Sequence, residues 1–317
     1  MEPRLLHVAN GACTTMTIET AGIPGVTSLW ADPLYDGPVP GGLDDDALTA
    51  VRMEHHAPNV AAADSDNDMR RWRQVIAEHA AYDELVLWYE HDLFDQLILM
   101  QLLPFVRAHV PASKPVSLIC IGSFPGRANF KGLGELHPGE LASLFPTRQP
   151  VTPAQYDMAA RAWRAFREPT PEPLDALRLG DTSALPFLAR ALTRFLEEYP
   201  WTRDGLSRTE RRLLTLAAAG QADWPASFPR MHVGEDAYYI SDTSHAELAE
   251  TLATTAPPLL TSSMQFPSLT QDGRDVLEGR ADRVALCGID RWFGGVHLQG
   301  HAVPWRWDCE RERIAPG

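Results

Sequence analysis

The densest group of reactive side chains is Glu90, His91 and Asp92, which follow directly after the apolar run ELVLWY at 84–89. Histidine exchanges a proton near neutral pH or ligates a metal, and a neighbouring carboxylate can fix its tautomer. A buried charge without a partner is costly, so three polar groups at the end of a buried strand indicate a ligand, metal or acid–base role. We predict Glu90, His91 and Asp92 as catalytic residues. The alternative for Asp92 is a structural N-cap of the following helix.

A divalent metal is the cofactor that these residue types suit best. Carboxylate and imidazole groups ligate such ions, and Asp32 lies just beyond another apolar run, GVTSLW at 25–30. The predicted metal ligands are Asp32, Glu90 and His91. The alternative for Asp32 is a structural role in the loop before Pro33.

The segment NGACTT at 10–15 predicts an anion cradle made of backbone amides at a helix N-terminus. The alternative is a tight turn with capping threonines. The segment lacks the three-glycine spacing of a dinucleotide fingerprint, and no P-loop lysine follows it, so no nicotinamide or P-loop nucleotide is expected. Beyond the other apolar runs lie the turn YDGP and the end of PVSLICIGS. The predicted substrate-binding residues are Asn10, Gly11, Thr14, Tyr35, Ser123 and Arg306.

Arg306 lies in the alternation WRW at 305–307, near the C-terminus. In a strand this pattern places both indoles on one face and the arginine on the other. One interpretation is a core closed by tryptophans, with Arg–Asp pairs satisfying one another. The other is an aromatic and cationic wall that completes the N-terminal crevice, where Arg306 meets an anionic substrate through two hydrogen bonds.

The elements that must position these residues alternate between strand and helix. The apolar runs 5–10, 25–30, 84–89 and 115–123 are separated by helical segments, which predicts a parallel sheet covered by helices. We therefore predict a Rossmann-like three-layer α/β domain over 1–148. Ligands of such sheets bind beyond the carboxyl ends of the strands, so the polar clusters should converge at one edge.

The rest of the chain has a different sequence pattern, with mainly helical signals. Residues 149–200 contain no strand signal and predict a helical linker region with the Pro-rich EPTPEP. Residues 201–317 predict a mainly helical, winged-helix-like domain, in which Ser207 and Glu210 form a capping box. The basic residues around SRTERRLL are the only support for contact with DNA, and contact with a protein partner, or a homodimer, is favoured over it.

Composition restricts the partners. The net charge of the 317 residues is −14, and positions 1–100 hold 17 acidic residues against five arginines and no lysine. Such a surface repels nucleic-acid phosphates, so nucleic-acid binding is not expected there. No apolar run has the length of a membrane span and no secretory signal is recognised, which predicts a cytoplasmic protein. The four scattered cysteines form no CxxC pair, which argues against a zinc ribbon or a disulfide framework.

For three further groups of residues, a structural role is favoured over a chemical one. Paired histidines such as His55 and His56 near a helix end usually face solvent. The acidic segment DSDND at 64–68 fits a helix-initiating turn better than a calcium loop, because the required glycine and glutamate are missing. Cys13 at a helix start could be a nucleophile, but a small buried cysteine is the commoner case.

Several phrases together resemble an uncharacterised bacterial family, catalogued as domain of unknown function 1835. They are LHVANGAC, GIPGVTSLWADPLYDGPVP, LWYEHDLFDQLILMQLL and GLGELHPGELASLF. The C-terminal GIDRWFGGVHLQG and WRWD resemble its companion domain. The resemblance implies a two-part, bacterial intracellular protein and supplies no activity.

The residues predict a hydrolase or group transferase that acts on a small polar or anionic substrate with metal assistance. No redox cofactor signature accompanies the polar strand ends. The alternative is a ligand-sensing regulatory protein, whose winged-helix-like domain binds a protein partner or DNA.

Overall fold

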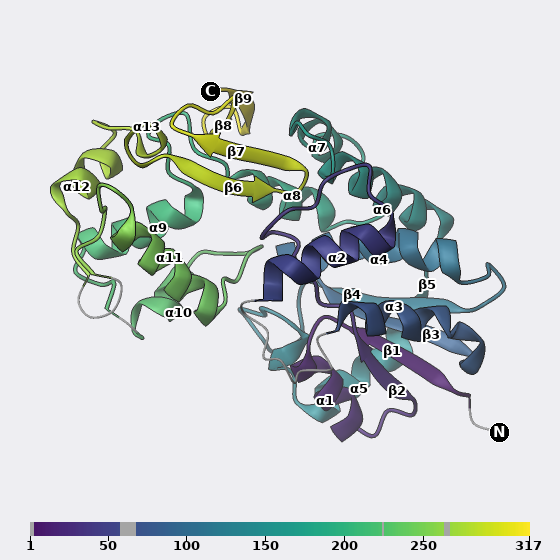
Figure 1. Cartoon of the computed structure of the whole chain (residues 1–317). Helices are drawn as coiled ribbons and strands as arrows, with labels where there is room; N and C mark the ends of the chain where they lie inside the picture. Colours follow the sequence, from purple (N-terminus) through teal and green to yellow (C-terminus); the bar gives the residue numbers. More distant parts are fainter. Residues whose placement is uncertain (1–2, 58–67, 224, 263–266) are drawn as a thin grey trace. The chain divides into compact units, whose positions relative to one another are not determined.

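The computed structural model describes residues 3–57, 68–223, 225–262 and 267–317. The chain divides into two compact units (Figure 1). The first comprises Met1–Ala191 with Gly294–Val296, and the second comprises Leu192–Phe293 with His297–Gly317.

The first unit is built on a five-stranded sheet with the strand order β2-β1-β3-β4-β5. The first four strands in this order run parallel, and β5 pairs antiparallel with β4. The predicted α/β class with a parallel sheet is therefore confirmed. The strands are β1 (Leu5–Ala9), β2 (Val26–Leu29), β3 (Glu84–Glu90), β4 (Val116–Ile121) and β5 (Gln149–Pro150).

Helices cover this sheet (Figure 1). On one side α1 packs against α5, and elsewhere α4 packs against both α3 and α6. The helices of the unit are α1 (Ala12–Thr20), α2 (Asp45–His56), α3 (Met69–Ala77), α4 (Leu93–His109), α5 (Pro138–Leu144), α6 (Pro153–Phe166) and α7 (Glu172–Arg178). Short 3₁₀ turns lie at η3 (His79–Ala81), η4 (Leu133–Glu135) and η5 (Phe145–Thr147). The segment 64–67 of the acidic run lies outside the described residues, and Asp68 caps α3.

Strand β3 is the centre of the core, and its residues from Leu85 to Glu90 are all buried. Val86 and Trp88 pack in one cluster with residues of α1 and α5, among them Ile18 and Leu141. Burial on both faces explains why this strand reads as a continuous apolar run rather than an alternating one. The consequence is that Glu90 stands at the end of a strand with little water around it.

The second unit is mainly helical. Its helix α9 packs against α10, α11 and α12, and Ser207 and Glu210 form the predicted capping box at its start. The helices are α9 (Arg208–Ala218), α10 (Ser227–Met231), α11 (Asp242–Thr254), α12 (Gln271–Leu277) and α13 (Arg283–Cys287), and α8 (Leu188–Leu196) contains the division between the units. Two two-stranded sheets follow, β6 (Ile289–Phe293) with β7 (Val296–Gly300), and β8 (Trp305–Asp308) with β9 (Arg313–Pro316), of which β8 and β9 run antiparallel.

The structure groups the middle of the chain differently from the predicted linker region 149–200. Helices α6 and α7 belong to the first compact unit, because α6 packs along α4. The short helices of the second unit are compatible with several helical folds, so its winged-helix-like character stays a prediction. Among the described residues, no helix combines the length and apolar character that crossing a bilayer requires.

Candidate functional site

Asn10 and Glu90 meet where the sheet changes direction. The chain passes from β1 to β2 on one side, whereas β3 lies on the other side of β1. Crevices at such switch points are the usual ligand sites of parallel sheets. The two residues follow the paired positions Ala9 and Trp88 of β1 and β3, and the Asn10 amide donates to Glu90 Oε1 at 2.8 Å. The predicted convergence of these strand ends is therefore present.

Asn10 is the hub of a network of polar side chains. Its amide nitrogen also donates to Asp95 Oδ2 at 2.8 Å, and its oxygen accepts from the Thr14 hydroxyl at 3.1 Å. The Asp95 carboxylate accepts the backbone N–H of Glu90 at 2.9 Å. Asp95 is fully buried, whereas 5% of Glu90 is exposed. Two carboxyl groups thus share one amide donor in a site with little water.

Glu90 is also held from the segment after β4. The backbone N–H of Leu133 donates to Glu90 Oε2. Gly132 lies so close that an added Cβ would stand 2.6 Å from Glu90 Oε1. Glycine at this position lets the backbone approach the carboxyl group, which any larger residue would displace.

Burial changes the ionisation of all three acids. It raises the pKa of Glu90 to about 8, with a further rise from the charge of Asp92, and the hydrogen bonds from Leu133 and Asn10 offset only part of this. Burial raises the pKa of Asp92 to about 6. Burial together with the charges of Glu90 and Asp92 raises the pKa of Asp95 well above its ordinary range. Near neutral pH the cluster therefore retains protons, as a general acid must.

Asp92 has a structural role as well. Its carboxylate accepts the backbone N–H of Asp95 at 2.9 Å and caps α4, so the capping prediction is confirmed. His91 is half-buried and lies near two aromatic rings, with ring-centroid distances of 6.2 Å to Phe130 and 6.1 Å to Phe187. Asn10, His91 and Asp92 are all partly exposed, so the cluster has an edge that solvent reaches.

The N-terminus of α1 adjoins this cluster. Gly11 is its N-cap residue and supplies no side-chain cap, and the first turn contains no acidic residue. Backbone donors left without a side-chain cap are a favourable place for an anion. Cys13 in this turn is exposed, so the expectation of a buried cysteine was wrong.

The structure gives Asp32 a different environment from the one predicted. Asp32 is fully buried and accepts from Arg52 Nη2 at 2.7 Å and Nε at 3.0 Å. Burial by itself would raise the pKa of Asp32, but the charge of Arg52 outweighs it and lowers this pKa to about 2. Because both oxygens face a guanidinium, we no longer expect Asp32 to ligate a metal.

Three other predicted substrate residues lie outside the Asn10 network. Tyr35 packs edge-on against Phe94 with a ring-centroid distance of 6.2 Å. Ser123 is exposed just after β4. Arg306 belongs to the second unit and donates to Asp282 at 2.6 Å, which matches the interpretation in which Arg–Asp pairs satisfy one another.

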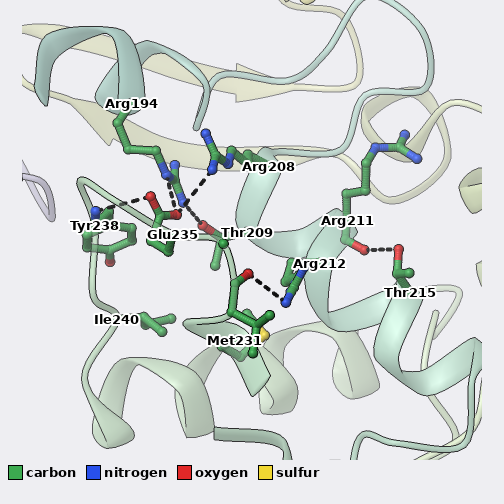
Figure 2. A pocket seen from close by; sticks show the side chains of 12 residues that line it. Arg194, Arg208, Thr209, Arg211, Arg212, Thr215, Met231, Glu235, Tyr238 and Ile240 are labelled. Atoms are coloured by element: carbon green, nitrogen blue, oxygen red, sulfur yellow. Dashed lines mark hydrogen bonds and ion pairs between the residues drawn. The ribbon is translucent and has the colours of Figure 1, made fainter. Parts of the chain in front are cut away.

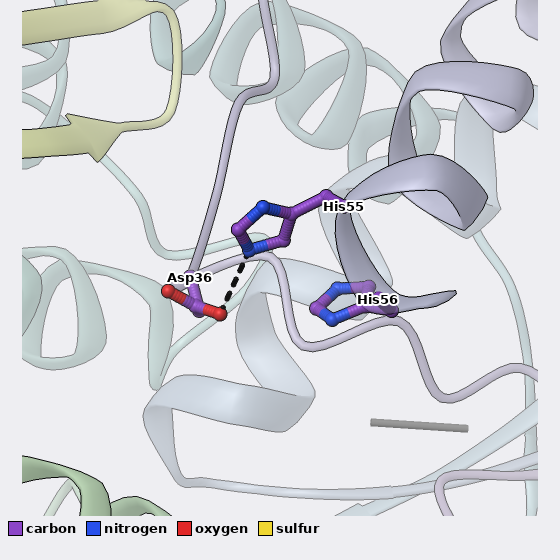
Figure 3. A group of neighbouring side chains, drawn as sticks. All are labelled: Asp36, His55 and His56. Carbon is purple, nitrogen blue, oxygen red and sulfur yellow. Dashed lines mark hydrogen bonds and ion pairs between the residues drawn. The ribbon is translucent and has the colours of Figure 1, made fainter. Parts of the chain in front are cut away.

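A metal-ligand set that the sequence analysis passed over lies in the first unit. Asp36, His55 and His56 place one ligand atom each within 4.8 Å of one another (Figure 3). The histidine side chains are 33% and 12% exposed, so they reach solvent only in part rather than facing it fully. The signal was weak because 19 residues separate the aspartate from the first histidine.

The second unit has a cavity of about 280 Å³ lined by arginines, including Arg194, Arg208 and Arg212 (Figure 2). Arg194 donates to Glu198 at 2.6 Å and to Glu235 at 2.8 Å. Burial would lower the pKa of Arg194, but these two carboxylates outweigh it and raise this pKa. Glutamates therefore neutralise much of the positive charge of the arginines that line this cavity. The arginines do not by themselves indicate an anion site.

Comparison with known proteins adds no assignment. No family model and no curated protein matches this chain. The resemblance to domain of unknown function 1835 stays an expectation that rests on its motifs, and the function has to be argued from the site.

Proposed function

We propose that this protein is an enzyme, a hydrolase or group transferase that acts on a small polar or anionic substrate at the end of β1 and β3. The observation that carries the proposal is the buried pair Glu90 and Asp95, joined by the Asn10 amide at a switch point of the sheet. A raised carboxyl pKa at such a place is a common property of catalytic acids.

In this proposal Glu90 is the general acid. It stays protonated near neutral pH and transfers its proton to the leaving group of the substrate. Asn10 and the Leu133 N–H hold the carboxyl group in place and stabilise the carboxylate that remains. The partly exposed His91 would accept a proton from the attacking nucleophile.

An anionic group of the substrate would bind the uncapped amides at the start of α1. Protonation of Glu90 and Asp95 removes their repulsion of such a group, and Asp92, with a pKa of about 6, is the acid of the cluster that is ionised at neutral pH. A largely protonated acid cluster beside an amide cradle therefore helps to reconcile an acidic sequence with an anionic substrate.

The substrate class can be found by thermal-shift screening with nucleotides, sugar phosphates and amino acids, followed by turnover assays on the compounds that stabilise the protein. We expect Glu90→Gln to lower kcat/KM by about 10²–10⁴-fold, because glutamine has the same shape and cannot donate the proton. The wild-type kcat/KM should fall as the pH rises through about 8.

The matched control is Glu78→Gln, an equal change at an exposed residue that caps the end of α3. It should retain full turnover. Equal kcat/KM values for the Glu90 and Glu78 variants would contradict the assignment of Glu90.

A further inference from the structure

The loop after β2 and the last turn of α2 bring an aspartate against two histidines. His55 Nε2 lies 3.0 Å from Asp36 Oδ2, and the rings of His55 and His56 meet edge-on with a centroid distance of 4.8 Å. Figure 3 shows His55 directed at the Asp36 carboxylate, with His56 beside it. Two imidazoles and one carboxylate thus gather from two separate elements of one unit.

The local sequence provides for this approach. Gly37 has a φ of +77°, and a Cβ added there would lie 2.2 Å from His55 Cδ2. Glycine therefore permits both the turn and the close passage of the loop over the imidazole. Helix α2 ends at His56, and the partial negative charge at a helix C-terminus favours a cation nearby.

Arg52 contacts two of these three residues. Arg52 Nη2 lies 2.8 Å from His56 Nε2, and Arg52 Nη1 donates to the Asp36 carbonyl at 2.6 Å. The same guanidinium is anchored by the buried carboxylate of Asp32, so its charge is balanced. The Arg52 guanidinium donates to His56 Nε2, so it fixes the orientation of this ring, and Nδ1 is the nitrogen of His56 that is left for a metal.

We propose that Asp36, His55 and His56 form a binding site for a divalent transition-metal cation such as Zn²⁺. Imidazole and carboxylate are the ligands that this class of ion prefers, and three protein ligands leave a position for water. Zinc bonds of about 2.0–2.1 Å place tetrahedral ligand atoms about 3.4 Å from one another. The side chains of Asp36 and His55 are 55% and 33% exposed, so they can rotate to close the set from its present 4.8 Å.

The chain contains a matched control for a simple His–Asp pair. His297 Nε2 lies 2.6 Å from Asp290 Oδ1, and the two side chains are 33% and 66% exposed. Stacking on Trp292 supports His297. A pair that only neutralises charge should behave like this one, whereas a third ligand should make the Asp36 set bind a metal much more tightly.

The test is calorimetric titration of the full, tag-free chain with ZnCl₂ after chelator treatment. We expect one equivalent to bind wild type, and His55→Ala and Asp36→Asn each to weaken binding by about tenfold or more. His297→Ala should bind like wild type. Both ligand variants change partly exposed side chains, and their circular dichroism should match that of wild type.

Absence of zinc binding to wild type would overturn the proposal, and so would equal weakening by His55→Ala and His297→Ala. The metal site does not depend on the proposed enzyme function. Glu90→Gln should leave zinc affinity unchanged, so a failure of the acid–base assignment and a failure of the metal site give different results.

Discussion

Replacing Arg52 with methionine should destabilise the protein by about 3–5 kcal/mol at neutral pH, because it leaves the buried Asp32 carboxylate without its partner. Both side chains are fully buried, and the guanidinium also donates to the Pro33 carbonyl at 3.1 Å. The loss therefore includes the guanidinium partner of a buried charge, which keeps His56 Nε2 at 3.7 Å, as well as hydrogen bonds. Denaturant unfolding of wild type and variant at pH 7 measures this difference.

The pH dependence of this effect follows from the low pKa of Asp32. In wild type that pKa is about 2, below the ordinary value of 3.8. The pair therefore contributes stability that is fully present above pH 3.8 and is lost as the pH falls toward 2. The difference in unfolding free energy between wild type and Arg52→Met should therefore be smaller at low pH than at pH 7, since protonated Asp32 carries no charge.

Two comparisons isolate the buried charge. Arg107→Met removes an arginine from an ion pair with Asp157 in which both side chains are more than half exposed, and it should cost about 1 kcal/mol or less. Adding Asp32→Asn to Arg52→Met should restore part of the lost stability by removing the unpaired charge. Equal losses for Arg52→Met and Arg107→Met would show that burial does not set the strength of the Arg52–Asp32 pair.

Glu90→Gln should remove a loss of stability that the wild-type protein shows as the pH rises. The pKa of Glu90 is about 8 in the folded protein against an ordinary 4.5. Between these values the unfolded chain has released the proton and the folded chain keeps it, so wild-type stability falls as the pH rises from 4.5 to 8. One pKa unit corresponds to about 1.4 kcal/mol. The variant should therefore gain about 2 kcal/mol or more relative to wild type between pH 5 and pH 8.

At pH 5 the variant should be slightly less stable than wild type, because a glutamine oxygen can accept from Asn10 or from Leu133 but its NH₂ group then faces the other donor. Guanidinium unfolding at several pH values gives both numbers. Glu78→Gln should run parallel to wild type throughout. A Glu90→Gln curve that also ran parallel would mean that Glu90 is ionised in the folded state.

The parallel sheet could be predicted from the sequence because each strand is a buried apolar run of strand length between helical segments. The polar residues at the ends of those runs could also be identified from the sequence, and Asn10 and Glu90 do lie together. Asp32, by contrast, pairs with Arg52 rather than facing a metal. The residues near Asp32 in the sequence do not indicate this pair, because Arg52 is 20 residues away on α2.

Local pattern by itself determined the four parallel strands of the first unit, that Glu90 ends a buried strand, and that Asp92 and Ser207 begin helices. These features depend on neighbours within a few residues. Only the tertiary structure decided which acid meets which donor. Asn10 and Glu90 are 80 residues apart, and they meet because the sheet order places β1 beside β3. The ionisation of Glu90 follows from that long-range packing, because burial and charge act through space. The gathering of Asp36 with two histidines follows from the approach of the loop after β2 to the end of α2.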